Sequence, residues 1–179
     1  MRPTVLQRLL LAGALAVTPM MMPPLMAQVG GNPLIDFPGY QNLTKEVAPY
    51  RAKRLIPLSD FQARAANGKA LVLDARSAQA FAEGHIKGAI NLPLPDFNAE
   101  ALARVIGTDT SREILIYCNN NFTNNVRPIP TKMVTLALNI QSFINLYGYG
   151  YRNIYELGEA VDMNDPAVQW VAAMPLTTG

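Results

Sequence analysis

The chain has 179 residues, of which 15 are basic, 13 are acidic, one is a cysteine and one is a histidine. A single cysteine excludes a disulfide within the chain, and one cysteine with one histidine cannot supply the ligands of an ordinary zinc site. The formal net charge of +2 lacks the basic excess of nucleic-acid-binding proteins, so nucleic acid is not an expected partner.

The first residues are typical of a secretory signal peptide. Arg2 and Arg8 introduce an apolar stretch without acidic residues, which ends in small or apolar residues up to Ala27. Residues 9–17 are too short for a membrane-spanning helix, which needs about 20 apolar residues. We expect cleavage after Ala27, a periplasmic or secreted protein, and no stable membrane insertion once residues 1–27 are removed. An uncleaved membrane anchor is the alternative.

Residues 28–54 carry glycine, proline and mixed charge without sustained periodicity. We interpret them as an N-terminal extension that packs on the domain but does not form its core. The basic cluster over residues 51–54 indicates a solvated linker rather than a binding patch. The domain itself is expected over residues 55–179.

Regular elements follow from Leu55. Ser59, with Gln62 three residues later, has the spacing of a capping box and predicts a helix, which Gly68 would end in the left-handed conformation. Residues 70–74 form an uninterrupted apolar run that closes on an aspartate. Such a run is typical of a strand buried on both faces of a parallel sheet.

Helices and strands then alternate. Ser77 is placed to cap a short helix that stops at Gly84, and a short strand is expected over residues 89–93. Asn98 is placed to cap another helix. Residues 113–117, "EILIY", predict a second buried strand, and the cysteine follows it directly.

The last third of the chain predicts a long helix, a strand and a final helix. The long helix would begin at Thr131 and end at Gly148. Its apolar stripe at helical spacing consists of Met133, Leu136, Ala137, Ile140, Ile144 and Tyr147. A strand is expected over residues 153–157, and Asp165 with Pro166 would start the final helix. This alternation implies an α/β fold whose central, mostly parallel sheet has helices on both faces.

Residues 71–93, "LVLDARSAQAFAEGHIKGAINLP", resemble the first half of a rhodanese domain. That family has Asp-x-Arg after a core strand, then a helix, then Gly-His-Ile-x-Gly-Ala-x-Asn. The matching residues are Asp74, Arg76, Gly84, His85, Ile86, Gly88, Ala89 and Asn91. "EILIYC" is similar to the strand that carries the family's cysteine, and residues 147–162 resemble a later glycine–tyrosine turn and strand. The resemblance spans about residues 55–170 and implies the rhodanese-like three-layer sandwich.

The resemblance also implies a nucleophile, Cys118, which would take a sulfane sulfur, hold it as a persulfide and pass it on. Asp74, Arg76 and His85 are expected to be structural residues near the site. The loop after the cysteine departs from the family, since Pro128 and Pro130 postpone the next helix and make the loop about twice the usual length. The candidate substrate-binding residues are Asn119, Asn120, Asn121, Phe122, Thr123, Asn124, Asn125, Arg127 and Lys132.

The reactivity of Cys118 depends on what surrounds its sulfur. If the loop amides and the helix near Thr131 point at the sulfur, the pKa of the thiol should lie below the value of about 8.5 of a free cysteine. Arg127 and Lys132 are the nearest basic residues in sequence and would add to this effect if the loop folds back. The competing expectation is a long loop that carries the helix end away and leaves an ordinary or buried, sluggish thiol.

Two functions from different classes stay open. One is a periplasmic sulfurtransferase or persulfide carrier that uses Cys118 on a small sulfur-containing or anionic substrate, with a protein as a further candidate acceptor. The other is a non-catalytic rhodanese-like module that binds a partner or small anion through the loop from Cys118 to Thr131. A phosphatase or arsenate reductase is disfavoured, because Asn124 stands where those enzymes need an arginine. No phosphate-binding loop or dinucleotide motif is present, and we expect no cofactor.

Overall fold

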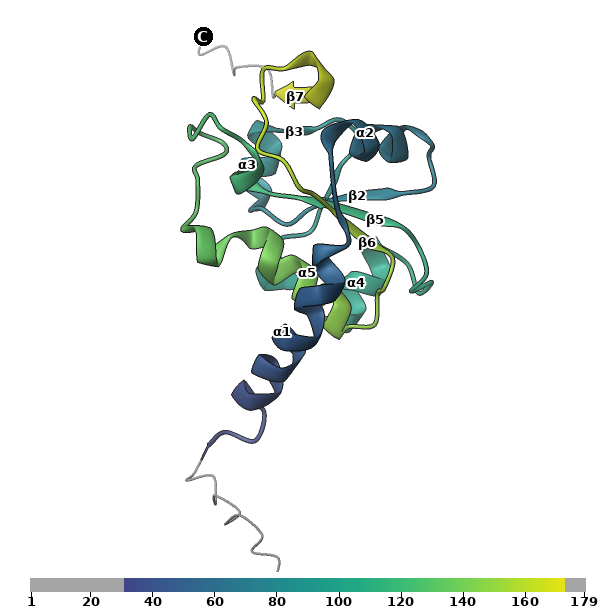
Figure 1. Ribbon diagram of the computed structural model, residues 1–179, viewed down its shortest axis with the longest axis vertical. Helices are drawn as coiled ribbons and strands as arrows, with labels where there is room; N and C mark the ends of the chain where they lie inside the picture. The colour runs from purple at the N-terminus through teal and green to yellow at the C-terminus, as the bar shows by residue number, and fades with distance from the viewer. Residues whose placement is uncertain (1–30, 173–179) are drawn as a thin grey trace, which may run out of the picture. The chain divides into compact units, whose positions relative to one another are not determined.

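The computed structural model describes residues 31–172 (Figure 1). The chain divides between Ile35 and Asp36, and the fold below is that of residues 36–172. The predicted signal peptide, residues 1–27, lies outside the described residues, so its cleavage stays a prediction. No helix in the described part of the chain is long and apolar enough to cross a membrane.

The elements alternate along the chain as the sequence indicates. The helices are α1 (Phe37–Ala52), α2 (Leu58–Ala66), α3 (Ala78–Glu83), α4 (Ala99–Val105) and α5 (Leu138–Gly148). The strands are β1 (Leu55–Ile56), β2 (Leu71–Asp74), β3 (Gly84–Ile86), β4 (Ile90–Asn91), β5 (Ile114–Tyr117), β6 (Ile154–Leu157) and β7 (Trp170–Ala172). Single 3₁₀ turns are η1 (Leu94–Asp96), η2 (Asn119–Asn121), η3 (Val134–Leu136) and η4 (Pro166–Val168).

The central sheet is parallel, with the strand order β1-β6-β5-β2-β4. Every residue of β2 and β5 is buried. Because successive side chains of a strand point to opposite sides, both faces of these two strands are covered. In β5, Ile114 and Ile116 enter the core on the side of α1, α4 and α5, whereas Leu115 and Tyr117 enter the core on the side of α2. Figure 1 shows the same three layers. The predicted α/β sandwich with helices on both faces is therefore confirmed.

Several predicted helix ends are confirmed. The Ser77 side chain accepts a hydrogen bond from Ala80 N, and the Asn98 side chain accepts one from Ala101 N. Gly68 has φ +72°, the left-handed conformation that ends a helix at low cost to glycine. The predicted cap at Ser59 is wrong, because α2 begins at Leu58. The first backbone N–H of this helix, that of Leu58, instead donates to the side chain of Glu159, which is far away in the sequence.

The described part of the predicted N-terminal extension, over residues 36–54, differs most from expectation. Pro38 lies in the first turn of α1, and Asp36 caps this helix by accepting from Gly39 N at 2.8 Å. Val47 is buried in the core cluster shared with α4 and α5. The expectation that this segment stays out of the core is wrong. One buried residue in an otherwise polar, proline-containing helix gives too little periodicity to be seen in the sequence.

The helix that follows the cysteine loop begins later than predicted. Thr131 and Lys132 are not helical, because their backbone N–H groups donate to the side chains of Asn125 and Asn120. Helix α5 begins at Leu138, and Met133 is 68% exposed. Half of the predicted stripe is confirmed, because Ala137, Ile144 and Tyr147 are buried, whereas Met133 and Leu136 are exposed and Ile140 is only partly buried. The buried face of α5 also includes four residues that the predicted stripe left out: Asn139, Ser142, Phe143 and Leu146.

The predicted final helix is only one turn. Asp165 caps η4 by accepting from Ala167 N, as the sequence predicts for a helix start. Gln169 then takes the left-handed conformation, with φ 54°, and the chain turns into β7. Strand β7 pairs antiparallel with β3, which gives a two-stranded ribbon beside the main sheet.

Candidate functional site

A buried ion pair lies at the carboxyl end of β2. Arg76 donates from Nη2 to Asp74 Oδ2 at 2.6 Å, and from Nε to both carboxylate oxygens at 3.0 Å. The Tyr117 hydroxyl donates to the same Oδ2 at 2.6 Å and accepts from Ile86 N at 3.0 Å. Burial, and then the Asp74 carboxylate, hold the pKa of Tyr117 well above its ordinary value. The cluster joins β2, β3 and β5 and is fully hydrogen-bonded.

Asn91 and His85, from the same 71–93 segment, bond to backbone groups around the ion pair. Asn91 donates from Nδ2 to the carbonyl oxygens of Asp74 and Arg76, both at 2.9 Å. The His85 ring stacks on Phe81 with its centroid 3.9 Å away, and its Nδ1 lies 2.9 Å from Phe81 O. Asp74, Arg76 and His85 make these contacts with the scaffold and none with Cys118.

Cys118 follows β5 at the same edge of the sheet and is 1% exposed. Its Sγ accepts from Asn120 N at 3.4 Å, and the backbone N–H groups of Leu138 and Asn139 also lower the pKa of the thiol. The latter two belong to the first turn of α5, so the start of that helix favours a negatively charged sulfur. The thiol itself donates to the side-chain oxygen of Asn139.

The expected depression of the cysteine pKa is wrong. Burial raises the pKa of Cys118, and it outweighs the lowering by the backbone N–H groups of Asn120, Asn139 and Leu138. The Glu156 carboxylate raises it further. Backbone N–H groups that lower the pKa are present as predicted, but they act on a sulfur that is shielded from water.

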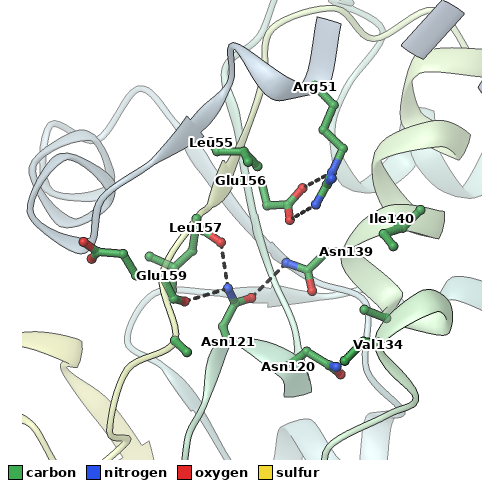
Figure 2. A pocket seen from close by; sticks show the side chains of 13 residues that line it. Arg51, Leu55, Asn120, Asn121, Val134, Asn139, Ile140, Glu156, Leu157 and Glu159 are labelled. Atoms are coloured by element: carbon green, nitrogen blue, oxygen red, sulfur yellow. Dashed lines mark hydrogen bonds and ion pairs between the residues drawn. The ribbon is translucent and has the colours of Figure 1, made fainter. Parts of the chain in front are cut away.

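Two asparagines build a buried hydrogen-bond network next to the sulfur. Asn121 accepts on Oδ1 from Cys118 N and from Asn139 Nδ2, both at 2.9 Å. It donates from Nδ2 to Leu157 O at 2.7 Å and to Glu159 O at 3.1 Å, as Figure 2 shows. The network ties the cysteine, α5 and the end of β6 together.

Of the predicted loop residues, the first three lie near the cysteine. Asn121 belongs to the network just described. The Asn120 side chain makes two hydrogen bonds to the backbone of Lys132: Nδ2 donates to the carbonyl oxygen at 2.9 Å, and Oδ1 accepts from the backbone N–H at 3.1 Å. Asn119 is buried, and its Oδ1 has no hydrogen-bond partner.

The remaining loop residues point away from the sulfur and fasten the loop elsewhere. Phe122 packs in the core on the α2 side of the sheet, and Thr123 N donates to Val161 O at 2.9 Å. Asn124 binds Asp162, and Asn125 holds the amide of Thr131. Arg127 does not fold back to the cysteine, because it pairs with Glu83 of α3, and the Lys132 side chain is exposed.

Two pockets flank the start of α5. The amide pocket, of 330 Å³, is lined by Asn120, Asn121, Asn139, Glu156 and Glu159 among others (Figure 2). The proline pocket, of 420 Å³, is lined by four prolines together with Asn119, Leu138 and Lys132. Cys118 lines neither pocket.

Sequence reasoning missed Asn139, Glu156 and Arg51. Glu156 in β6 is buried and forms a bidentate pair with Arg51 of α1, with Nε–Oε2 at 2.6 Å and Nη2–Oε1 at 2.5 Å. The available signal was a polar residue at an otherwise apolar buried position, as for Asn139 in α5. Among the described residues, no group of three or more His, Cys, Asp or Glu side chains could hold a metal ion.

The model of the rhodanese-like domain matches residues 58–158. The chain belongs to the rhodanese-like domain family. No curated protein sequence matches it. Among solved structures it is similar to the rhodanese-like domain of the Alr3790 protein from Anabaena sp., with 17% identity over 70% of this chain and 85% of that one and a TM-score of 0.46.

Two further structures are comparably distant from this rhodanese-like chain. The BH2092 protein from Bacillus halodurans has 20% identity over 69% of this chain and 75% of that one, with a TM-score of 0.43. A full-length protein from Lactobacillus plantarum has 26% identity over 67% of this chain and 88% of that one, with a TM-score of 0.36.

Proposed function

We propose that this rhodanese-like protein is a sulfurtransferase or persulfide carrier in which Cys118 Sγ receives the sulfur. The observation that carries the proposal is the position of Sγ at the carboxyl end of a central parallel strand, where Asn120 N donates to it and the N–H groups of Leu138 and Asn139 lower its pKa. Donors in this arrangement stabilise a negatively charged sulfur, whether thiolate or persulfide. A cysteine that only fills space in a core does not need such donors around its sulfur.

The chemical step is a displacement at sulfur. The Cys118 thiolate attacks the outer sulfur of a sulfane donor, such as thiosulfate, and forms a new S–S bond. The donor's own S–S bond breaks, and its electron pair leaves with sulfite. An acceptor thiolate, from a small thiol or a protein, then takes the outer sulfur and returns the Cys118 thiolate.

The site needs an opening motion before it can act. Cys118 is 1% exposed, and its thiol proton is held by the Asn139 side chain. Attack requires a thiolate and a path for the donor, so the first turn of α5 or the Asn139 side chain must move.

The test is mass spectrometry of the purified protein after incubation with thiosulfate or polysulfide. The proposal expects one added sulfur atom on the peptide that contains Cys118 and none in Cys118→Ser. The same preparation should transfer sulfur to cyanide or to a small thiol at a rate that Cys118→Ser abolishes. No sulfur uptake with either donor would overturn the proposal.

A non-catalytic binding module is the second candidate. Its supporting observation is the buried, protonated thiol, since burial raises the pKa of Cys118. On this hypothesis, Cys118→Ser would leave the physiological role intact, and the amide or proline pocket would take the ligand. We further propose that the protein acts in the periplasm or outside the cell, as its N-terminal sequence predicts.

A further inference from the structure

The orientation of the Asn121 side chain is dictated by backbone groups. Its Nδ2 faces the carbonyl oxygens of Leu157 and Glu159, which can only accept hydrogen bonds. Its Oδ1 faces Cys118 N, which can only donate. The opposite orientation would place oxygen against two oxygens and nitrogen against a donor, so only one arrangement satisfies the site.

The orientation of Asn139 follows from that of Asn121. Asn139 Nδ2 donates to Asn121 Oδ1 at 2.9 Å, so Asn139 Oδ1 is turned toward Cys118 Sγ. A carboxamide oxygen is only an acceptor, and it is satisfied here only if the sulfur carries a hydrogen. Two fixed carbonyls thereby place, through two side chains, an acceptor against the sulfur, which favours the thiol form that burial also favours.

Asn139 contacts both the sulfur and the amide pocket. It is buried in the first turn of α5, its side chain meets Cys118 Sγ, and it lines the amide pocket (Figure 2), whose lining does not include Cys118. With its side chain displaced toward that pocket, the N–H groups around Sγ would remain in place.

One charged group acts on the sulfur besides Asn139: Glu156 of β6 raises the pKa of Cys118, although it is paired with Arg51 of α1. Helix α5 itself carries no charged residue. Asp74 and Arg76, beyond the end of β2, pair with each other. On the loop, the Lys132 side chain is exposed, and Arg127 is paired with Glu83.

We propose that Asn139 is a positioning residue that keeps Cys118 Sγ in the thiol form and shuts it off from the amide pocket, so that displacement of its side chain switches the sulfur to the reactive form. The consequence for sulfur transfer rests on the proposed function. The control of protonation does not, and it can be measured without any sulfur donor.

The experiment measures the rate of Cys118 alkylation by iodoacetamide against pH in the full-length protein. Asn139→Ser removes the carboxamide acceptor and supplies a hydroxyl that can donate to a thiolate. Its titration midpoint should fall by about one pH unit, the size expected for one hydrogen bond, and its rate near neutral pH should rise roughly tenfold. Asn139→Asp keeps an acceptor and adds a negative charge, so its midpoint should rise.

The matched control is Asn145→Ala on the same helix, whose side chain bonds only to its own helix at Gln141 O. It should leave the midpoint unchanged. A mere loosening of the structure would admit water to the sulfur and lower the midpoint as well. It would lower the midpoint at least as much in Asn139→Ala, which lacks the hydroxyl donor, whereas the proposal expects a smaller fall in Asn139→Ala than in Asn139→Ser.

A folded Asn139→Ser protein with the wild-type midpoint would overturn the inference. If that variant fails to fold, Asn139→Asp decides, because a midpoint at or below wild type contradicts a role as acceptor. Absence of sulfur on Cys118 would sink only the proposed function and leave this titration result standing.

Discussion

At the scale of single residues, the site is defined by what the side chains accept and donate. The asparagine-rich loop was identified from the sequence, but its amides serve mainly to bind backbone groups of residues 131–132 and 157–163. The decisive asparagine, Asn139, lies outside that loop. Its role could not be predicted, because the contact between Cys118 and Asn139 spans 21 residues and depends on where α5 begins.

The raised pKa of Cys118 predicts a pH-dependent stability. The folded protein holds the thiol proton more tightly than the unfolded chain does. The stabilisation that this gives to the folded state is therefore fully present below the unfolded pKa of about 8.5, and it is lost as the pH rises through the folded pKa. Urea titrations between pH 7 and 10 should therefore show a smaller loss of stability in Cys118→Ser than in wild type. Equal slopes would contradict a raised pKa.

Tyr117 offers a test of the buried ion pair. Tyr117→Phe removes the hydroxyl that donates to Asp74 Oδ2 and accepts from Ile86 N. Each of these buried groups then loses one hydrogen-bond partner that water does not replace. We expect a loss of about 1–3 kcal/mol in the free energy of unfolding. Tyr149→Phe is the control: its exposed hydroxyl makes one long bond to Phe97 O, and its removal should cost less than about 0.5 kcal/mol.

At the scale of elements, features that depend on neighbouring residues were predicted, whereas features that depend on residues distant in the sequence were not. Strands β2 and β5 were evident from apolar runs, and the caps Ser77 and Asn98 from residue type. The start of α2 was mispredicted because Leu58 N is satisfied by Glu159 Oε2 at 2.7 Å, a partner that local sequence does not reveal. The start of α5 was mispredicted for the same reason, since side chains of the loop take up the amides that a helix would use.

The phase of α5 can be checked by core truncation. Leu146 is fully buried, whereas Ile140 is only partly buried. Leu146→Ala should therefore cost about 2–5 kcal/mol of unfolding free energy, and Ile140→Ala distinctly less. A larger loss for Ile140→Ala in denaturant titration would restore the phase predicted from the sequence.

Helix α1 depends on a partly buried ion pair. Arg51→Ala would leave Glu156 with its charge but without its bidentate partner, and we expect a loss of about 2–4 kcal/mol. The control is Arg104→Ala, which breaks an exposed pair with Glu100 on α4 and should cost less than about 0.5 kcal/mol. Thermal or urea unfolding would measure both, and equal losses would mean that α1 is not anchored by this pair.

At the scale of the whole molecule, the fold class and the sheet were predictable because the alternation of strands and helices admits few arrangements. The role of residues 37–52 was not, since a helix with one fully buried side chain resembles a polar linker in sequence. The two-stranded ribbon of β3 and β7 was also unforeseen. Its partners are far apart in the chain, and each strand has only three residues.

Export is the prediction that concerns the chain as a whole. We expect the mature protein to begin at Gln28, because a basic start and an apolar middle lead to the small residue Ala27. N-terminal sequencing of protein from a periplasmic extract would measure this. An intact Met1 in a soluble cytoplasmic pool would contradict it.

The β3–β7 ribbon pairs two strands that are synthesised far apart in time. Trp170 lies so close to Gly84 that a Cβ there would stand 2.7 Å from its Nε1, and its ring also faces the Arg76 guanidinium at 5.4 Å. During synthesis, the Arg76 side chain therefore lacks this ring contact until residue 170 has left the ribosome. Since Trp170 is the only tryptophan, its fluorescence during refolding should report the closure of this last strand separately from the formation of the sheet.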